Sequence, residues 1–263
     1  MKAIILALFA LCSFPAFAGE WTLAAINKHI DETNFILGQP ANCSGTLISV
    51  SERLIITNHH CIRQYIKTRS RDVVSADGTV SQVKYEVIDD VPVSQKVYAG
   101  HQLASQMNFQ TTVIAYDEDT DLALIQFRAA SIPNTIASHI YTGPPVQRGE
   151  TVYAVGNPLG LDATLTRGII SSVTRRLKVG SDEKSFFQMD AGIAPGNSGG
   201  SLYNSEGQMI GIPAAAAVGT MIGLSIPYTS IQEFLSDACY AAVFDATAAS
   251  HADCESAKEA DSK

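Results

Sequence analysis

Charge is scarce in this sequence, and basic clusters are missing from it. Charged residues make up 17% of the 263 positions, and 18 basic against 26 acidic side chains give a formal net charge of −8. No segment gathers Lys and Arg into a patch, so a nucleic-acid backbone is not an expected partner, because clustered cations are what such backbones bind. A hydrophobic content of 46% excludes a disordered or collagen-like chain. The chain is long enough to bury a proper core.

A membrane anchor is not expected either. Residues 209–225 carry no charge, but Gly211, Pro213, Gly219 and Gly223 interrupt the run. A spanning helix needs about 20 mainly apolar residues. We therefore expect strands and a loop in this stretch.

The first eighteen residues have the pattern of a signal peptide. Lys2 precedes the apolar stretch 3–14, and residues 16–18, Ala-Phe-Ala, form a small-x-small cleavage site. A lipoprotein signal at Cys12 is the alternative, which the bulky Leu11 disfavours. Removing residues 1–18 from 263 leaves 245, and the loss of Lys2 changes the formal charge from −8 to −9. We expect an exported protein, either periplasmic or secreted.

Cysteine is infrequent, with five residues, and Cys12 falls in the expected signal peptide. The other four form an even number, which in an exported chain favours two disulfides because the compartment is oxidising. Counting does not fix their pairing. The sequence has no Cys-x-x-Cys or clustered His spacing, so we expect no metal site, and no cofactor is implied.

Short β-rich runs separated by turn residues dominate the rest of the chain. The runs are Asn34–Leu37, Gly45–Val50, Leu54–Thr57, Thr79–Ile88, Leu122–Phe127, Thr151–Val155, Gly168–Val173 and Met209–Ile212. No long helical period interrupts them, which predicts an antiparallel all-β fold rather than alternating βαβ units.

Pro and Gly gather at 131–145, and this stretch predicts a linker between two β domains of similar size. The expected organisation is a signal peptide (1–18), a helical segment (19–34), a first barrel (35–130), the linker (131–145), a second barrel (146–228), and a C-terminal helix and tail (229–263). Ser230 to Glu233 has the form of a capping box, which predicts the start of that helix. Beyond Cys254 we expect a frayed polar tail.

Three short motifs occur in the order His, Asp, Ser. They are Thr-Asn-His-His-Cys at 57–61, Thr-Asp-Leu-Ala-Leu-Ile at 120–125 and Pro-Gly-Asn-Ser-Gly-Gly at 195–200. Each alone has an ordinary structural explanation, as a strand end or a turn. Together they indicate serine catalysis, because a serine hydroxyl is a poor nucleophile until a base takes its proton.

In these motifs the sequence resembles the chymotrypsin-like serine proteases, and most closely their bacterial HtrA/Deg branch. The resemblance runs from about Asn42 to Leu235. Further phrases carry it, in the family's order: Cys-Ser-Gly-Thr-Leu-Ile at 43–48, Gly-Asn-Pro-Leu-Gly at 156–160, Thr-Arg-Gly-Ile-Ile-Ser at 166–171 and Gly-Leu-Ser-Ile-Pro at 223–227. It implies a fold of two six-stranded antiparallel β-barrels and an endopeptidase acting on protein or peptide substrates.

The resemblance implies a role for each motif residue. Ser198 is the expected nucleophile, His60 its base and Asp121 the carboxylate that orients His60. His59 is the rival base, but in the family motif the catalytic histidine directly precedes the cysteine, and neighbours on a strand point to opposite faces.

The Gly-rich phrase around Ser198 is expected to form the oxyanion hole. The resemblance assigns the hole to the amides of Gly196 and Ser198, with Asn197 shaping the loop. Asn197 stands where relatives that are activated by a freed amine carry Asp, so we do not expect that mode of activation.

An uncharged primary pocket follows from the same resemblance. It puts the pocket floor at Gly192 and the wall at Ala214, Ala215, Ala216 and Ala217, and it keeps Asp190 out of the floor. No Lys, Arg or His occurs between Lys184 and His251. We expect small or medium apolar side chains before the cleaved bond.

The resemblance also suggests how the cysteines pair. Cys43 and Cys61 match a disulfide common in animal chymotrypsin-like enzymes, which leaves Cys239 and Cys254 as a second pair. His60 and Asp121 lie 61 positions apart, which predicts an extra loop or strand pair at 89–112. The sequence leaves little room after the second barrel, so PDZ domains, and the cage assembly and chaperone activity that go with them, are not expected.

Two other functions remain open at this point. The chain could be a catalytically silent, protease-like binding protein, although its three motifs are intact. It could also be a dipeptidyl-peptidase-like exopeptidase, although that class carries a large helical insertion. The oligomeric state is not predicted.

Overall fold

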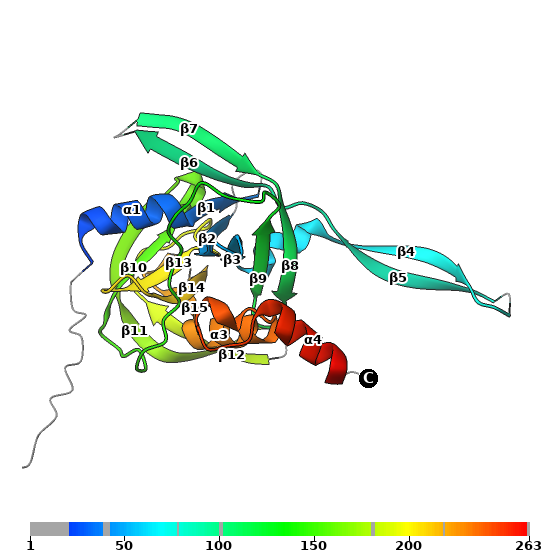
Figure 1. Ribbon diagram of the computed structural model, residues 1–263. Coiled ribbons are helices and arrows are strands. Elements are labelled where there is room, and N and C mark those ends of the chain that lie inside the picture. Colours follow the sequence, from blue (N-terminus) through cyan, green and yellow to red (C-terminus); the bar gives the residue numbers. More distant parts are fainter. Residues whose placement is uncertain are drawn as a thin grey trace, which may run out of the picture.

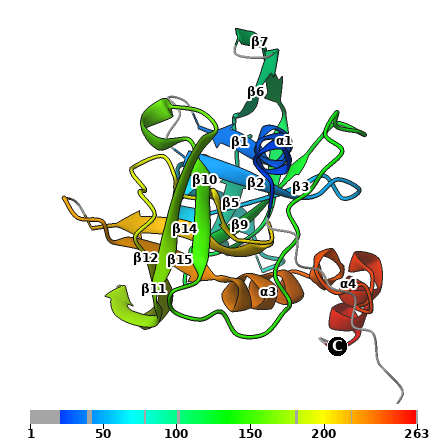
Figure 2. The ribbon, with the colours of Figure 1, turned by 90° about the vertical axis from the view of Figure 1, so that its left-hand side faces the viewer.

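The computed structural model describes residues 21–38, 43–77, 79–99, 102–179, 182–217 and 219–261. The expected signal peptide lies outside these residues. Two antiparallel β-structures lie side by side, with the helices at their margins (Figures 1 and 2). The helices are α1 (Leu23–Thr33), α2 (His59–Ile62), α3 (Tyr228–Asp237) and α4 (His251–Asp261), with 3₁₀ turns η1 (Arg63–Tyr65), η2 (Pro158–Gly160) and η3 (Ala241–Val243).

The first β-structure is a seven-stranded sheet in the order β7-β6-β1-β2-β3-β9-β8. Its strands are β1 (Asn34–Leu37), β2 (Cys43–Ser49), β3 (Leu54–Thr57), β6 (Val93–Ala99), β7 (Gln102–Phe109), β8 (Thr111–Asp117) and β9 (Leu122–Phe127). The edge strands β7 and β8 follow one another in the chain with Gln110 between them, so the two edges of the sheet meet there.

The second β-structure is a closed barrel in the order β10-β11-β12-β15-β14-β13. Its strands are β10 (Thr151–Gly156), β11 (Thr164–Val179), β12 (Asp182–Met189), β13 (Ser201–Asn204), β14 (Met209–Ala216) and β15 (Gly223–Pro227). Six strands therefore close this half, as the resemblance implies.

The all-β class is confirmed, but the first half differs from a closed six-stranded barrel. It has seven strands, and among the described residues no ladder closes it. The seventh strand arises because β7, which pairs with β6, is separated from β8, which pairs with β9, by Gln110 alone. The β6–β7 hairpin, in which Val93 pairs with Phe109 and Ala99 with Gln102, lies in the segment 89–112 where an extra loop or strand pair is expected.

A second insertion was not predicted as such. Strands β4 (Ile66–Val74) and β5 (Val80–Ile88) pair only with each other and project from the body as a long arm (Figure 1). The expected β-run Thr79–Ile88 corresponds to β5, but the sequence does not predict its pairing with β4 in a hairpin.

Strand β3 is buried on both faces, and each face packs into a different hydrophobic core. Leu54 and Ile56 of β3 pack into the cluster between the two β-structures, while Ile55 packs into the interior of the first sheet. Side chains alternate between faces along a strand, so a strand buried on both faces becomes a continuous apolar run. Ile30 of α1 and Ile231 of α3 also pack into the cluster between the two β-structures.

Two expectations for the C-terminal region are wrong. Helix α3 begins at Tyr228 after an N-cap at Pro227, so Ser230 lies inside the helix and forms no capping box. The expected frayed tail is largely helix α4, which Cys254 ties to Cys239 through a disulfide. Among the described residues, no helix is both long and apolar enough to cross a membrane.

Candidate active site

His60 lies at the start of a short helix rather than on a strand. Strand β3 ends at Thr57, and Asn58 caps helix α2, which opens with His59 and His60. The expectation that the two histidines point to opposite faces of a strand is therefore wrong, because both lie in helix α2. Their surroundings do differ, because the His59 ring stacks on Tyr116 with centroids 5.2 Å apart, whereas the His60 ring meets Asp121.

Asp121 holds His60 through both carboxylate oxygens. Its Oδ2 lies 2.8 Å from His60 Nδ1, and its Oδ1 accepts the His60 backbone N–H at 2.8 Å. The carbonyl of Asp121 accepts the Asn58 side-chain amide at 2.9 Å and the His59 N–H at 3.1 Å. These four contacts, two from the carboxylate and two from the backbone carbonyl, hold Asp121 against residues 58–60. They leave Nε2 as the ring nitrogen of His60 able to serve as a base.

The backbone of Asp121 is in the left-handed region, at φ +57°. This conformation costs a non-glycine residue about 1 kcal/mol or more, and Asp is among the residues that tolerate it best. The Asn58 and His59 contacts compensate for that cost. Sequence analysis alone does not identify this strain.

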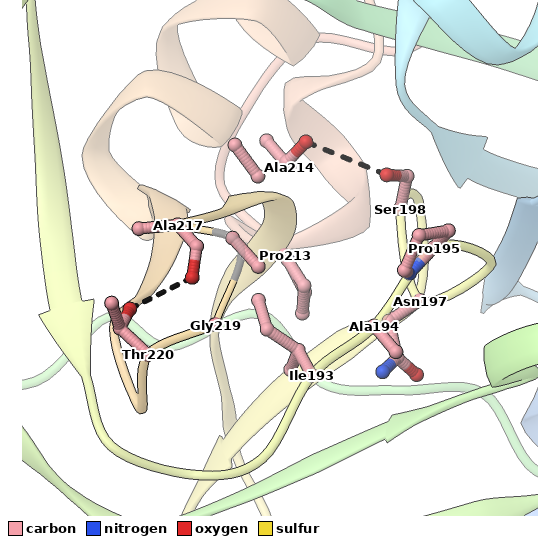
Figure 3. Close-up of a pocket in the computed structure, with 12 residues that line it drawn as sticks. Ile193, Ala194, Pro195, Asn197, Ser198, Pro213, Ala214, Ala217, Gly219 and Thr220 are labelled. Atoms are coloured by element: carbon pink, nitrogen blue, oxygen red, sulfur yellow. Dashed lines mark hydrogen bonds between the residues drawn. The ribbon is translucent and has the colours of Figure 1, made fainter.

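Ser198 lies on the opposite side of the cleft, in the loop that precedes β13. Its hydroxyl donates to the Ala214 carbonyl at 3.4 Å (Figure 3). Its own backbone carbonyl accepts the Ser44 N–H at 2.8 Å. This hydrogen bond to the Ala214 carbonyl is long and therefore weak, so the hydroxyl can leave it readily.

Two glycines of the loop 195–200 have a positive φ and no room for a side chain. Gly196 has φ +106°, and a Cβ there would lie 2.4 Å from the Asn157 carbonyl oxygen. Gly199 has φ +80°, and a Cβ there would lie 2.1 Å from Thr57 Oγ1. Larger residues at either position would displace the loop, which explains the Gly-rich phrase around Ser198.

The amides expected to form the oxyanion hole are free of internal partners. Among the described residues, neither the Gly196 N–H nor the Ser198 N–H donates to another group. The Asn197 N–H donates to the Ala194 carbonyl at 3.0 Å and so holds the loop instead. Two amides of the loop are thus available as donors, and the third stabilises the turn.

A buried polar cluster that sequence analysis missed supports the loop. Ser44 Oγ donates to the Gly196 carbonyl at 2.7 Å and accepts from the backbone N and the Nδ2 of Asn157, at 2.8 and 2.9 Å. Asn157 also exchanges hydrogen bonds with Asn34 on β1. Ser44 and Asn157 are almost fully buried. Both belong to quoted motifs, but their partners are far away in sequence and only the fold brings them together.

An apolar cavity of 510 Å³ opens beside Ser198 (Figure 3). Ala214, Ala215 and Ala216 line it as expected, together with Ala217. Gly192 is not among the lining residues, and its carbonyl instead accepts a hydrogen bond from Thr166 at 2.8 Å. The neighbouring Ile193 lines the cavity in its place.

No charged side chain lines this cavity. The remaining lining residues are Ala194, Pro195, Asn197, Pro213, Gly219 and Thr220. Asp190 lies outside it, with its carboxylate accepting the Ile169 N–H at 2.7 Å. The cavity is therefore suited to a small or medium uncharged side chain.

A second cavity, of 280 Å³, lies on the histidine side of the cleft. It shares Ala214 and Ala215 with the first cavity. Both His59 and His60 line it, so the expectation that only one of the two histidines reaches the cleft is wrong. The Ser198 side and the His60 side are thus joined along one wall.

The disulfides of the structure join the pairs suggested by the resemblance. Cys43 at the start of β2 is bonded to Cys61 in α2, and Cys239 to Cys254. The sulfurs of Cys43 and Cys61 and one His60 nitrogen lie within 4.8 Å of one another. Because the two sulfurs are bonded to each other, this group is not a metal site.

Two β-structures flanking a cleft, a His–Asp pair on one side and a serine between glycines on the other, define the class of chymotrypsin-like serine peptidases. The family model described as the trypsin-like peptidase domain matches residues 43–212, so the chain belongs to that family.

Curated relatives support the HtrA branch within this family. A probable periplasmic serine endoprotease, DegP-like, from Chlamydia pneumoniae is 35% identical over 59% of this chain and 31% of its own length. The putative serine protease HhoA from Synechocystis is 43% identical over 45% of this chain and 31% of its own. The periplasmic pH-dependent serine endoprotease DegQ from Escherichia coli is 32% identical over 70% of this chain and 34% of its own. The chain spans about a third of the length of these relatives.

Proposed function

We propose that this protein is an exported serine endopeptidase that cleaves peptide bonds through His60, Asp121 and Ser198. The observation that carries the proposal is the two-point contact between Asp121 and His60, opposite a serine in a loop with two free amides. That contact directs His60 Nε2 into the cleft as a general base.

The reaction has two halves that use the same groups. His60 takes the Ser198 proton as Ser198 Oγ bonds to the substrate carbonyl carbon, and the amides of Gly196 and Ser198 stabilise the oxyanion. His60 then protonates the departing amine, which leaves an ester on Ser198. Water, deprotonated by His60, hydrolyses that ester and restores the serine.

The proposal that the protein is exported rests on the signal-peptide pattern at 1–18 and on the two disulfides, which are typical of an oxidising compartment. Periplasmic relatives support the same location. We propose protein or peptide substrates, because these relatives are named serine endoproteases.

Labelling with a fluorophosphonate tests the catalytic serine directly. We expect stoichiometric labelling of Ser198 that is lost in Ser198→Ala and strongly slowed in His60→Ala. Ser205→Ala, at an exposed turn residue, is the matched control and should label normally. A folded protein that shows no Ser198-dependent labelling would instead be the silent, protease-like binding protein.

The primary pocket is proposed to select small or medium apolar side chains. The uncharged 510 Å³ cavity with its alanine wall supports this choice. A peptide library should show cleavage after such residues, and preferred cleavage after Arg, Lys or Glu would contradict the assignment. In Ile193→Ala the preference should move toward larger apolar residues by about 10-fold or more, since a few methylene groups in a pocket are worth about 1–3 kcal/mol.

A further inference from the structure

The arm formed by β4 and β5 is an unusual structure for a chain to carry alone. The two strands pair over their whole length, from Ile66 with Ile88 to Val74 with Val80, and form a sheet of their own. At the root, Lys67 forms an ion pair with Asp89, and the Tyr116 hydroxyl donates to Glu86. Beyond the root the arm extends away from the body (Figure 1). An isolated two-stranded hairpin is only marginally stable in water.

One face of this arm combines cations with apolar groups. Directly paired residues share a face, and the pairs Arg69 with Tyr85, Arg71 with Val83, and Val73 with Ser81 lie on the same one. The Arg71 guanidinium lies 5.7 Å from the centre of the Tyr85 ring. Tyr85 and Val83 are exposed by 41% and 42%. We call these six residues the arm face, and it carries no acidic side chain.

The opposite face of the arm is different. It pairs Thr68 with Glu86, Ser70 with Lys84 and Asp72 with Gln82, so its charges are mixed. The positive charge of the arm is therefore concentrated on the arm face, on a protein with a net charge of −8.

A groove of opposite character lies between β8 and α3. It has a volume of 450 Å³ and is lined by Ala115, Tyr116, Asp117, Thr120, Glu233, Phe234, Asp237 and Ala238. We call it the acidic groove, because it has three carboxylates and no cationic lining residue. Among the described residues, no cation forms an ion pair with these carboxylates, although Lys258 donates to the Asp237 backbone carbonyl.

We propose that the arm face of one copy docks in the acidic groove of a second copy. Arg69 and Arg71 would face Asp117, Glu233 and Asp237, while Tyr85 and Val83 would cover the apolar wall that Phe234 contributes. The arm cannot reach the acidic groove of its own chain. Tyr116 lines that groove and donates a hydrogen bond to Glu86 at the root of the arm, and from this root the arm extends away from the body (Figure 1).

The contact is reciprocal. If the arm of the first copy enters the groove of the second, a two-fold axis brings the second arm to the first groove, so one closed dimer satisfies both. Elsewhere the copies carry net negative charge and repel each other, which leaves the arm and groove as the favoured orientation.

Charge reversal tests the proposal in a background of Ser198→Ala, which prevents self-digestion. Sedimentation velocity at low salt should show a dimer for the unreversed protein. The reversed arm, Arg69→Glu with Arg71→Glu, and the reversed groove, Glu233→Arg with Asp237→Arg, should each associate at least about 10-fold more weakly. An equimolar mixture of the two should dimerise again, because both contacts in the mixed dimer join opposite charges.

The matched control is Lys84→Glu, a reversal on the opposite face of the same arm. It should leave the dimer intact, while Arg71→Glu alone weakens it. Circular dichroism establishes that each variant is folded.

Several results would overturn the proposal. These are a monomer at all concentrations, a reversed arm that dimerises normally, equal damage from Lys84→Glu and Arg71→Glu, and a mixture that stays monomeric. If the protein is a monomer and the reversed arm, placed in the protein that keeps Ser198, loses protein cleavage, the arm face binds substrates instead. Fluorophosphonate labelling does not depend on any of these outcomes, so the proposed enzyme stands or falls separately.

Discussion

At the scale of single residues, the candidate site depends on contacts that fix orientation more than on unusual charge. Asp121 contributes four such contacts to the segment 58–60, two from its carboxylate and two from its carbonyl. The motif Thr-Asp-Leu predicts a carboxylate before a strand. It does not predict the left-handed backbone of Asp121, because that conformation arises from partners 61 to 63 positions away.

Asp121→Asn should therefore lower kcat far more than it lowers stability. An amide can still accept one hydrogen bond, but it cannot hold His60 in the tautomer that leaves Nε2 free, nor stabilise the imidazolium. Such a change in a serine protease triad costs about 10⁴-fold in kcat.

Steady-state kinetics with a peptide ester at neutral pH, beside thermal unfolding, measures the two effects. The matched control is Asp119→Asn, two residues away at an exposed position of the same turn, which should keep near-normal activity. A kcat for Asp121→Asn within 10-fold of the unmodified protein would contradict the assigned role.

At the scale of elements, the strands that bury both faces are the ones the sequence predicts best. The bounds of β1, β3 and β9 match the expected runs Asn34–Leu37, Leu54–Thr57 and Leu122–Phe127. The arm is harder to predict because only one of its two strands alternates: β5 has Val83, Tyr85 and Val87 on one face, whereas residues 67–72 of β4 include no apolar side chain. Helix α4 has the same difficulty, since its residues are largely exposed and its position depends on the Cys239–Cys254 disulfide.

Helix α1 contributes a pH-sensitive contact that sequence analysis does not identify. His29 Nε2 lies 3.1 Å from Ser138 Oγ, and its ring meets Trp21 and Tyr203 edge to face. Burial lowers the pKa of His29 from 6.5 to about 4, against the opposing effect of the nearby Glu32 carboxylate. His29 is therefore neutral in the folded protein throughout the mildly acidic range.

Because the folded pKa of His29 lies below its unfolded value, the stabilisation is complete above pH 6.5 and is lost as the pH falls toward 4. Only the unfolded chain takes up the proton in that window, which lowers the free energy of unfolding by up to about 3 kcal/mol. Urea unfolding of the protein and of His29→Gln at pH 7.5, 5.5 and 4.5 tests this. The difference between the two should shrink on acidification, and parallel curves would show that His29 is not the source.

At the scale of the whole molecule, the two β-structures are joined by apolar packing and by several polar contacts. The apolar packing includes Leu54 and Leu124 from the first and Tyr203 and Ile226 from the second. The polar contact nearest the expected oxyanion loop is made by Ser44, which connects β2 of the first to the Gly196 carbonyl and to Asn157 in the second. The expected oxyanion loop is thus held from the opposite β-structure, so docking of the two halves and shaping of the loop are the same event.

Ser44→Ala should accordingly weaken both stability and turnover. It removes the hydrogen-bond partner of the Gly196 carbonyl and of the Asn157 backbone N–H, which costs about 1–3 kcal/mol per unsatisfied group. Since Gly196 O and the expected donor N–H belong to adjacent peptide groups, kcat should fall by about 10-fold or more, while KM for a short peptide stays within about 2-fold.

The control is Thr46→Val on the same strand, because the buried Thr46 hydroxyl has no hydrogen-bond partner among the described residues. That change should leave kcat unaltered and stability equal or higher. Activity is counted per fluorophosphonate-reactive site, which corrects for any unfolded fraction. If Ser44→Ala unfolds more easily but keeps its full kcat per reactive site, Ser44 joins the two β-structures without shaping the loop.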